Sequence, residues 1–418
     1  MRDASSVSTS TTSGITVCAS TSASASRRRF RWLAAPADAR PKRSVRITAV
    51  RILQVITRGD EIGGAQMHVL ELSKALVNDG HDVMVASSLG AALAEPLTAA
   101  GVRVVQSAAL GKAINPAADL SSYRFLRHVI REYAPALVAT HSSKAGVLGR
   151  LAAARERVPC TFTAHGWAFH EHVPLLKRSV YGSVERAMAP LTDRIICVSG
   201  YDHALAVKAG MAPRRLVKIA NGISDVTESL RSVPGRTGTV RIVMVARFAV
   251  PKDHTTLLQA FRNVRGAELL LVGDGPLLER ARQMASALGV ADRTMFLGAR
   301  GDVPELLAGG DISVLLSNRE GLPISVLEAM RAALPVVVSN VGGAGETIVN
   351  GESGFLVERG DVAGVAATLQ RLVDDAALRA RTGSLARARF LSEFSLRSMY
   401  LQTRHVYEDV IAERRRPR

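Results

Sequence analysis

Short apolar runs alternate with longer amphipathic segments along most of the chain. Runs of four to eight apolar residues predict buried strands, and apolar residues spaced three and four apart predict helices. In the first half, the predicted strands are 50–57, 82–87, 102–105, 136–140, 160–164, 194–198 and 216–220. Helical spacing fills the intervals between them, at 65–78, 91–100, 116–133, 144–155, 174–189 and up to residue 209. This alternation predicts a mostly parallel sheet with helices on both faces.

A second series of the same kind follows residues 224–238, which carry Pro234, Gly235 and Gly238 and predict a linker. Helices in this series continue to about residue 394, and its strands are predicted at 240–246, 268–272, 294–297, 312–316 and 335–339. The amphipathic stretch that follows, 396–411, could pack on either half, and the sequence does not say which.

The pattern as a whole predicts an α/β fold of two Rossmann-like parallel-sheet domains that face each other across a cleft, with a ligand at the carboxyl ends of the strands. The predicted parts are a disordered Ser-, Thr- and Arg-rich extension at 1–44, an N-terminal domain at 45–230, a C-terminal domain at 238–395, and a helix with a basic tail at 396–418. The 418 residues, 47% of them hydrophobic, leave room for two such cores. No apolar run reaches the roughly 18 residues that span a bilayer.

Much of the net charge of +17 lies on the tails, with nine Arg and Lys against two Asp in residues 1–46 and four Arg in 414–418. An anionic membrane surface and nucleic acid both attract such charge. The sequence favours the membrane and no nucleic acid, because it has no zinc-finger spacing and few aromatic residues for base stacking. The cysteines, Cys18, Cys160 and Cys197, are odd in number and widely spaced, which argues against disulfides and a metal site and favours a reducing compartment. Cys160 and Cys197 are predicted to be buried.

The segment 317–330 joins a predicted strand to a helix and carries two carboxylates, Glu320 in the loop and Glu328 on the helix. Pro323 fits the first turn of that helix. Backbone amides at a helix N-terminus can hold phosphate, and carboxylates can accept hydrogen bonds from sugar hydroxyls. A surface glutamate and an ordinary helix glutamate are the alternative, which the segment alone leaves open.

Other polar residues follow predicted strands in the first half. Gly63 and Gly64 open a helix and could let a diphosphate approach the backbone, although a tight turn is the alternative. They do not form GxGxxG, so a nicotinamide or flavin cofactor is not supported. His165 ends a strand and could handle a proton or donate a hydrogen bond, as could His141, unless either is structural.

In the second half, Arg247 and Lys252 follow a strand and could bind a diphosphate. Arg247 would bind it through two parallel hydrogen bonds from its planar guanidinium group, and Lys252 through the point charge of its ammonium group. Two glycine-rich segments, 273–276 and 342–346, predict turns, the first with Asp274 as a helix cap and the second either turning or approaching the ligand. The chain has no DxD, GxSxG, HExxH or Walker A motif.

Taken in order, these motifs resemble those of the retaining glycosyltransferases of family 4, which have the GT-B fold. The resemblance covers about residues 50–395 and rests on Gly63-Gly64, His165-Gly166, Asn221-Gly222, Arg247 and Lys252, Gly273-Asp274-Gly275-Pro276, and Glu320 and Glu328. It implies transfer of a sugar from a nucleotide-sugar donor with retention of anomeric configuration. It implies no metal and no cofactor besides the donor, in agreement with the missing DxD.

The resemblance also implies a role for each matched position. Arg247 and Lys252 would neutralise the departing diphosphate, and Glu328 would hold the ribose. Glu320 would hold the donor sugar, and His165 would contact it near the reacting centre. The phosphates would be lined by Gly63, Gly64, Gly321, Leu322, Pro323 and Ile324. No nucleophile is nominated, because the family is thought to react on the donor's front face without a stable protein-bound sugar.

A narrower resemblance, at residues 140–146 and 148–151, is to capsule and exopolysaccharide members of the family. It implies a lipid-linked saccharide acceptor and a cytoplasmic enzyme at the inner face of the cell membrane, with a UDP-sugar favoured as donor. The sequence departs from the family in its long leader and in Val250-Pro251. A transferase for a small soluble acceptor, a GT-B nucleotide-sugar epimerase and an inactive nucleic-acid-binding relative remain alternatives.

Overall fold

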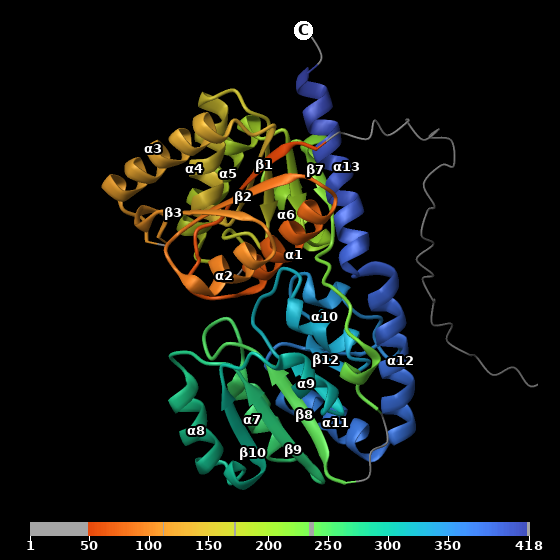
Figure 1. The fold of residues 1–418 in the computed structure, drawn as a ribbon. Coiled ribbons are helices and arrows are strands. Elements are labelled where there is room, and N and C mark those ends of the chain that lie inside the picture. Colours follow the sequence, from red (N-terminus) through yellow and green to blue (C-terminus); the bar gives the residue numbers. More distant parts are fainter. Residues whose placement is uncertain (1–48, 112, 171–172, 234–237, 416–418) are drawn as a thin grey trace, which may run out of the picture. The chain divides into compact units, whose positions relative to one another are not determined.

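The computed structural model describes residues 49–111, 113–170, 173–233 and 238–415 (Figure 1). The predicted extension at 1–44 lies outside these residues, and the chain from Val45 onward forms one compact unit. In the part of the chain that the structure describes, no helix is both long enough and apolar enough to cross a membrane.

The first half of the described chain forms a parallel sheet of seven strands in the order β3-β2-β1-β4-β5-β6-β7. The strands are β1 (Arg51–Val55), β2 (Asp82–Ser87), β3 (Arg103–Gln106), β4 (Leu137–His141), β5 (Cys160–Ala164), β6 (Arg194–Cys197) and β7 (Leu216–Lys218). The helices are α1 (Gly64–Asn78), α2 (Ala91–Ala99), α3 (Pro116–Tyr133), α4 (Ser143–Arg155), α5 (Leu175–Met188) and α6 (Gly200–Lys208).

The second half forms a parallel sheet of six strands, again counted over the described residues, in the order β10-β9-β8-β11-β12-β13. The strands are β8 (Val240–Val245), β9 (Ala267–Val272), β10 (Thr294–Gly298), β11 (Ile312–Leu315), β12 (Val336–Ser339) and β13 (Phe355–Val357). The helices are α7 (His254–Phe261), α8 (Leu278–Ala287), α9 (Val303–Ala308), α10 (Ile324–Arg331), α11 (Val362–Asp374), α12 (Ala376–Glu393) and α13 (Leu396–Arg415). The predicted GT-B class, two parallel-sheet α/β domains, is confirmed.

Some local predictions were wrong. The sequence pattern did not predict β13, which has three residues and is too short to show a period. Asp274 does not cap a helix, because α8 begins at Leu278 and the Asp274 carboxylate accepts from Gly275 N instead, at 2.6 Å. Pro323 is the N-cap of α10 rather than a residue of its first turn, so the helix begins at Ile324.

Alternate residues of the first sheet face two separate helical layers, as the pleat requires. Ile52 and Ile56 pack with α1 and α2, whereas Leu53 and Val55 pack with α3 and α4. Cys160 belongs to the second of these clusters. The predicted burial of Cys160 and Cys197 is confirmed, and burial raises the pKa of each thiol to about 12.

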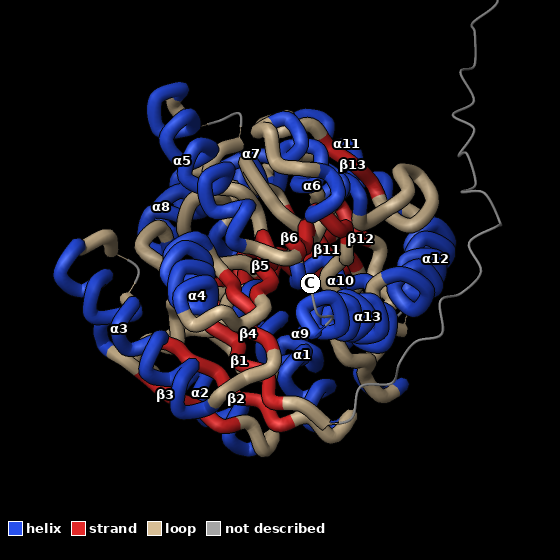
Figure 2. Tube along the Cα trace, turned by 90° about the horizontal axis from the view of Figure 1, so that it is seen from above, coloured by secondary structure: helices blue, strands red, loops and turns tan. Residues whose placement is uncertain are grey.

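The last helix, α13, returns to the first sheet, which answers the question that the sequence left open. Its Met399, Val406 and Tyr407 join the apolar cluster that contains Ile52 and the α1 side chains. In Figures 1 and 2, α13 lies beside α1. The C-terminal helix therefore belongs to the core of the first domain although it follows the second in sequence.

The strand order of each sheet reverses once. The loops that follow the two strands at this switch point lead away from each other and leave a crevice between them. In the first sheet β1 lies between β2 and β4, and Val55 pairs with Thr140. In the second sheet β8 lies between β9 and β11. The loops that leave β1, β4 and β5 and those that leave β8 and β11 carry the predicted site residues.

Candidate active site

Lys252 and Glu320 form an ion pair in the second domain. Lys252 pairs through its backbone with Ser317, which places its ammonium group against the Glu320 carboxylate. Ser317 Oγ donates a second hydrogen bond to Glu320 Oε1, at 2.5 Å. Both charged side chains are mostly buried, so the pair is shielded from solvent yet lies in loops at strand ends. The structure thus brings these two predicted site residues together.

Arg247 does not join the Lys252–Glu320 pair, although Arg247 and Lys252 both follow strand β8. Its Nη1 contacts Glu61 Oε1 at 2.9 Å, and the side chain is about half exposed. Glu61 also pairs with Arg58, whose guanidinium donates two hydrogen bonds to Asp60, of 3.1 and 3.0 Å. The loop after β1 in the first domain therefore supplies the carboxylate that holds Arg247.

Glu328 lies on α10, away from both ion pairs. Among the described residues, no group donates a hydrogen bond to its carboxylate, and Arg331, on the same helix, is the charge that acts on it. Burial raises the pKa of Glu328 to about 7, which the charge of Arg331 only partly opposes. A carboxylate in these surroundings keeps its hydrogen-bonding capacity for a ligand.

The backbone of Gly321 lies against the end of β5 in the first domain. A Cβ on Gly321 would lie 2.7 Å from the carbonyl oxygen of His165, so only glycine fits there. Gly64, the first residue of α1, lies near Ile324, since a Cβ at Gly64 would be 3.5 Å from Ile324 Cγ1. Gly63 is the N-cap of α1. The glycines of both domains therefore meet around the N-terminus of α10, where Leu322 and Pro323 are buried.

The segment 342–346 of the second domain supports this contact. Gly343 N donates to the Glu320 carbonyl oxygen at 3.1 Å, and a Cβ on Gly343 would lie 2.0 Å from the Gly321 carbonyl oxygen. Glu346 then caps α6 of the first domain, accepting from Gly200 N at 2.9 Å and from Tyr201 N at 2.7 Å. A carboxylate is favourable at a helix N-terminus, so this contact joins the two halves. The segment 342–346 is therefore more than a turn, because it packs on the Glu320 loop and caps a helix of the first domain.

Three histidines lie together beneath the first-domain side of the site. Gln54 donates to Ser73 Oγ and accepts from His141 Nε2, at 2.7 and 3.0 Å. His141 therefore carries its proton on Nε2, and its Nδ1 accepts from His165 Nε2 at 3.2 Å. His165 then has a bare Nδ1, which is buried and has no hydrogen-bond partner among the described residues.

His68 completes this histidine network from α1. Its Nδ1 lies 3.1 Å from Asn221 Oδ1, and Asn221 Nδ2 donates to the Leu322 carbonyl oxygen at 2.9 Å. Burial lowers the pKa of His68 to about 4 and holds those of His141 and His165 well below their usual range. The network is therefore neutral at physiological pH.

The histidine network also has the donor set of a metal site, since its three ligand nitrogens lie within 4.8 Å of one another. His141 and His165 already share a proton in a hydrogen bond, and a metal bound to both nitrogens would displace it. The absence of a metal requirement remains a prediction.

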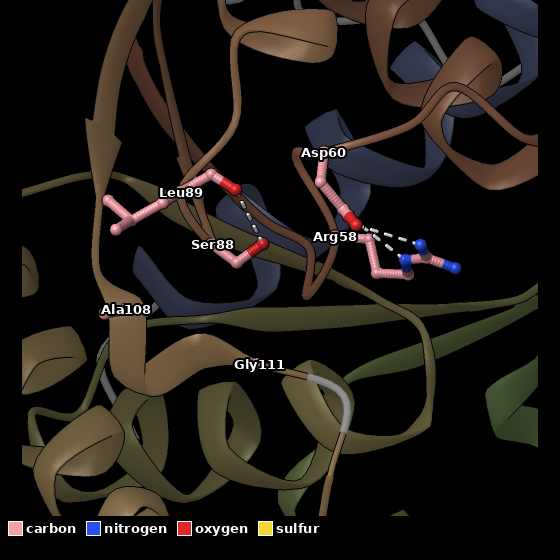
Figure 3. Close-up of a pocket in the computed structure, with 6 residues that line it drawn as sticks. All are labelled: Arg58, Asp60, Ser88, Leu89, Ala108 and Gly111. Atoms are coloured by element: carbon pink, nitrogen blue, oxygen red, sulfur yellow. Dashed lines mark hydrogen bonds and ion pairs between the residues drawn. The ribbon is translucent and has the colours of Figure 1, made fainter.

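A hollow of about 410 Å³ opens beside the loop after β1. Figure 3 shows the residues that line the hollow and the hydrogen bonds between Arg58 and Asp60. These residues follow the carboxyl ends of β1, β2 and β3. The lining residues are Arg58, Asp60, Ser88, Leu89, Ala108 and Gly111. Its lining residue Asp60 directly precedes Glu61, the partner of Arg247.

Three residues of the site were missed in the sequence. His68 follows Gly64 by one helical turn, but its place in an apolar helical stripe made it look like core. Glu61 lies two residues before Gly63 and Glu346 ends the segment 342–346, but the partners of both come from distant parts of the chain. Only the spacing of His68 from the glycine pair could have drawn attention to it.

Two parallel-sheet domains whose loops meet around one helix N-terminus, with cations at the strand ends, have the architecture of the GT-B class of glycosyltransferases. A solved structure of Anabaena HepE in complex with UDP and glucose has this fold, with a TM-score of 0.76 and 22% identity over 86% of this chain and 100% of that one. Residues 62–226 match the model described as Glycosyltransferase Family 4, and residues 226–389 match the one described as Glycosyl transferases group 1. The two matches meet inside the predicted linker.

The chain belongs to glycosyltransferase family 4. It is 31% identical over 273 residues to EpsD of Bacillus subtilis, which is assigned as a glycosyltransferase, covering 61% of this chain and 71% of that protein. It is 27% identical over 373 residues to an Escherichia coli enzyme, the UDP-Gal:alpha-D-GlcNAc-diphosphoundecaprenol alpha-1,3-galactosyltransferase. That similarity covers 84% of this chain and 95% of the E. coli enzyme.

Proposed function

We propose that the protein transfers a hexosyl group from a UDP-sugar to a lipid-linked or polysaccharide acceptor in cell-surface glycan synthesis, retaining the anomeric configuration and using no metal ion. The observation that carries the proposal is that Arg247 and Lys252, which both follow β8, each pair with a carboxylate. Arg247 pairs with Glu61 of the loop after β1, and Lys252 pairs with Glu320 of the loop before α10. A diphosphate can replace those carboxylates as the partner of both cations. The E. coli relative, which uses UDP-Gal and a diphosphoundecaprenol acceptor, supports the choice of donor and acceptor.

In this proposal the second domain holds the nucleotide. Glu328 accepts hydrogen bonds from the ribose hydroxyls with its unpaired carboxylate, while backbone groups around Gly64 and Ile324 lie against the phosphates. Arg247 and Lys252 neutralise the charge that grows on the diphosphate as its bond to the sugar C1 breaks. Glu320, released in part from Lys252, accepts from the sugar hydroxyls.

The first domain contributes neutral groups at the sugar. His165 Nδ1 accepts from a hydroxyl of the donor sugar, because Gln54 and His141 fix the proton on Nε2. The acceptor enters from the hollow beside Arg58 and Asp60. Its hydroxyl oxygen bonds to the sugar C1 on the face that the diphosphate leaves, and its proton passes to the departing phosphate oxygen. No protein-bound sugar forms.

We place the enzyme at the cytoplasmic face of the cell membrane, where a lipid-linked acceptor would present its saccharide. The basic tails predicted from the sequence suit an anionic lipid surface. Nucleic acid is not part of the proposal, since the site residues recognise hydroxyls and a diphosphate.

The test is to incubate the full-length protein with a panel of nucleotide sugars in excess chelator and to follow release of the nucleotide. We expect release from a UDP-sugar, and transfer with retained anomeric configuration when a diphosphate-linked lipid saccharide is added, as read by NMR of the product. Release only with added divalent metal, or an inverted product, would contradict the mechanism. Equal transfer to a small soluble acceptor, or an epimerised sugar without transfer, would replace the proposed reaction by one of its alternatives.

A further inference from the structure

The helix α5 carries apolar side chains on the face that the protein leaves uncovered. Leu176, Val180 and Val184 follow one another at intervals of four residues, so they lie along one side of the helix. Their exposed fractions are 79%, 52% and 40%. These three residues, named here the α5 stripe, form a continuous apolar surface, whereas a single exposed aliphatic side chain would need no explanation.

Polar and small residues hold the opposite face of α5 to the first domain. Glu185 is buried and pairs with the fully buried guanidinium of Arg150 at 2.6 Å. Gly182 lies against an aromatic ring, since a Cβ there would be 3.9 Å from Phe169 Cγ. These contacts fix the orientation of α5. The α5 stripe therefore faces away from the first domain. Figure 2 shows α5 at the outer edge of the described fold.

The charges beside the α5 stripe are positive. Within residues 175–188, the exposed charged side chains are those of Lys177 and Arg186, because the Glu185 carboxylate is buried and Arg178 is half-buried. Lys177 lies beside the stripe, whereas the Arg186 side chain lies over the first domain, since a Cβ at Gly210 would be 3.4 Å from Arg186 Cδ. Aliphatic side chains beside a cation, on a helix whose one carboxylate is buried, match the region where acyl chains meet anionic headgroups.

We propose that α5 binds the surface of an anionic lipid bilayer, with Leu176, Val180 and Val184 inserted at the level of the headgroups. The proposal deepens the proposed function and rests on it, because a lipid-linked acceptor gives the contact its purpose. The helix has 14 residues and lies along the surface rather than spanning it.

A second copy of the chain fits the α5 stripe less well. Three aliphatic side chains fall far short of the roughly 800 Å² per partner that a stable protein interface buries. A symmetric contact would also bring Lys177 toward its own copy. A bilayer needs neither a large matching surface nor an opposing acidic patch on a protein.

The position of α5 connects such a surface to the active site. From His165 the chain passes through Trp167 and Phe169, whose rings are 4.9 Å apart between centroids, before α5 begins. His170, the next residue, accepts from Arg319 of the Glu320 loop at 2.5 Å. The segment that leads into α5 therefore touches both halves of the site.

Vesicle flotation with the full-length protein tests the proposal. The vesicles are phosphatidylcholine with or without phosphatidylglycerol, and high salt screens the basic tails but not apolar insertion. The variant carries Leu176→Ser, Val180→Ser and Val184→Ser together. The matched control carries Leu385→Ser, Leu391→Ser and Leu401→Ser, at positions exposed to 43%, 48% and 41% on α12 and α13.

We expect the wild type and the control to remain on phosphatidylglycerol vesicles at high salt, and the stripe variant to bind at least about tenfold more weakly. Equal binding by the stripe variant, or no binding by the wild type at high salt, would overturn the proposal. So would a wild-type dimer that the stripe substitutions dissolve without any vesicle binding. Nucleotide release from a UDP-sugar, measured without lipid on the same samples, should be equal in all three proteins. Loss of that release in every protein while flotation behaves as expected would refute the proposed function and leave the membrane contact standing.

Discussion

At the ends of β4 and β5 in the first domain the histidine side chains are neutral, whereas after β8 and β11 in the second domain the polar side chains are ion-paired. His141 and His165 are buried, hydrogen-bonded and held neutral by pKa values well below the usual range. Lys252 and Glu320 form a shielded pair of opposite charges. A hydroxyl-rich sugar needs directed neutral hydrogen bonds, and a diphosphate needs positive charge. The two domains therefore differ in the part of the donor that each suits.

The largest expected effect comes from the charged side. Lys252→Ala removes the shielded cation that meets the diphosphate, and we expect kcat with a UDP-sugar to fall roughly 10²–10³-fold. Lys252→Arg should restore little, because a planar fork does not fit a site built for a point charge. Steady-state kinetics measure this, with Lys208→Ala on α6 as a control for an exposed lysine. Full activity in Lys252→Ala would remove Lys252 from the site.

Glu328→Gln should weaken UDP binding and, at alkaline pH, raise the stability of the folded protein. We expect roughly tenfold weaker UDP binding, because a charged acceptor of the ribose hydroxyls is lost. The pKa of Glu328 in the folded protein, about 7, lies above the ordinary value of 4.5 for a glutamate, so the wild type loses stability as the pH rises through that interval. The variant should therefore melt at a higher temperature than the wild type at pH 8, and the difference should shrink at pH 5.

Calorimetry and thermal melts check both effects of Glu328→Gln. Wild-type UDP binding should itself weaken as the pH falls below about 7, because the carboxyl becomes protonated. A stability difference that does not depend on pH would mean that folding does not raise the pKa of the Glu328 carboxyl.

An intermediate loss of kcat is expected when the neutral histidine network of the first domain is changed. His141→Phe removes the acceptor that fixes the His165 proton, and we expect kcat to fall about tenfold with little change in the KM of the donor. His141→Gln can still accept from His165 and donate to Gln54, so it should recover most of the activity. Equal losses in both variants would indicate a role in packing and not in positioning.

The smallest effect is expected at Glu61, where the ion pair is exposed. Glu61→Gln releases Arg247 for the diphosphate, and we expect the donor KM to fall by less than about fivefold. Glu352→Gln, a change on an exposed loop of the second domain, is the control. A rise in KM would show that Glu61 helps to place Arg247 rather than compete for it.

The order of the elements could be predicted from the sequence because apolar periodicity reports burial, and a parallel α/β fold buries its strands on both faces. Residues at strand ends, such as His165 and Lys252, could be nominated for the same reason. The partners of those residues could not, because Glu61 and Arg247 meet only after two domains have folded. β13 was too short to show a period, and α13 could have covered either core because its apolar stripe suits both.

In the proposed mechanism, Glu328 of the second domain holds the nucleotide, whereas His165 of the first domain contacts the donor sugar. Calorimetric titration with UDP, which has no sugar attached, tests it most directly when wild type, His165→Ala and Glu328→Ala are compared in chelator. We expect His165→Ala to bind UDP as the wild type does and Glu328→Ala to bind it at least about tenfold more weakly. A loss of UDP affinity in His165→Ala as large as that in Glu328→Ala would contradict it.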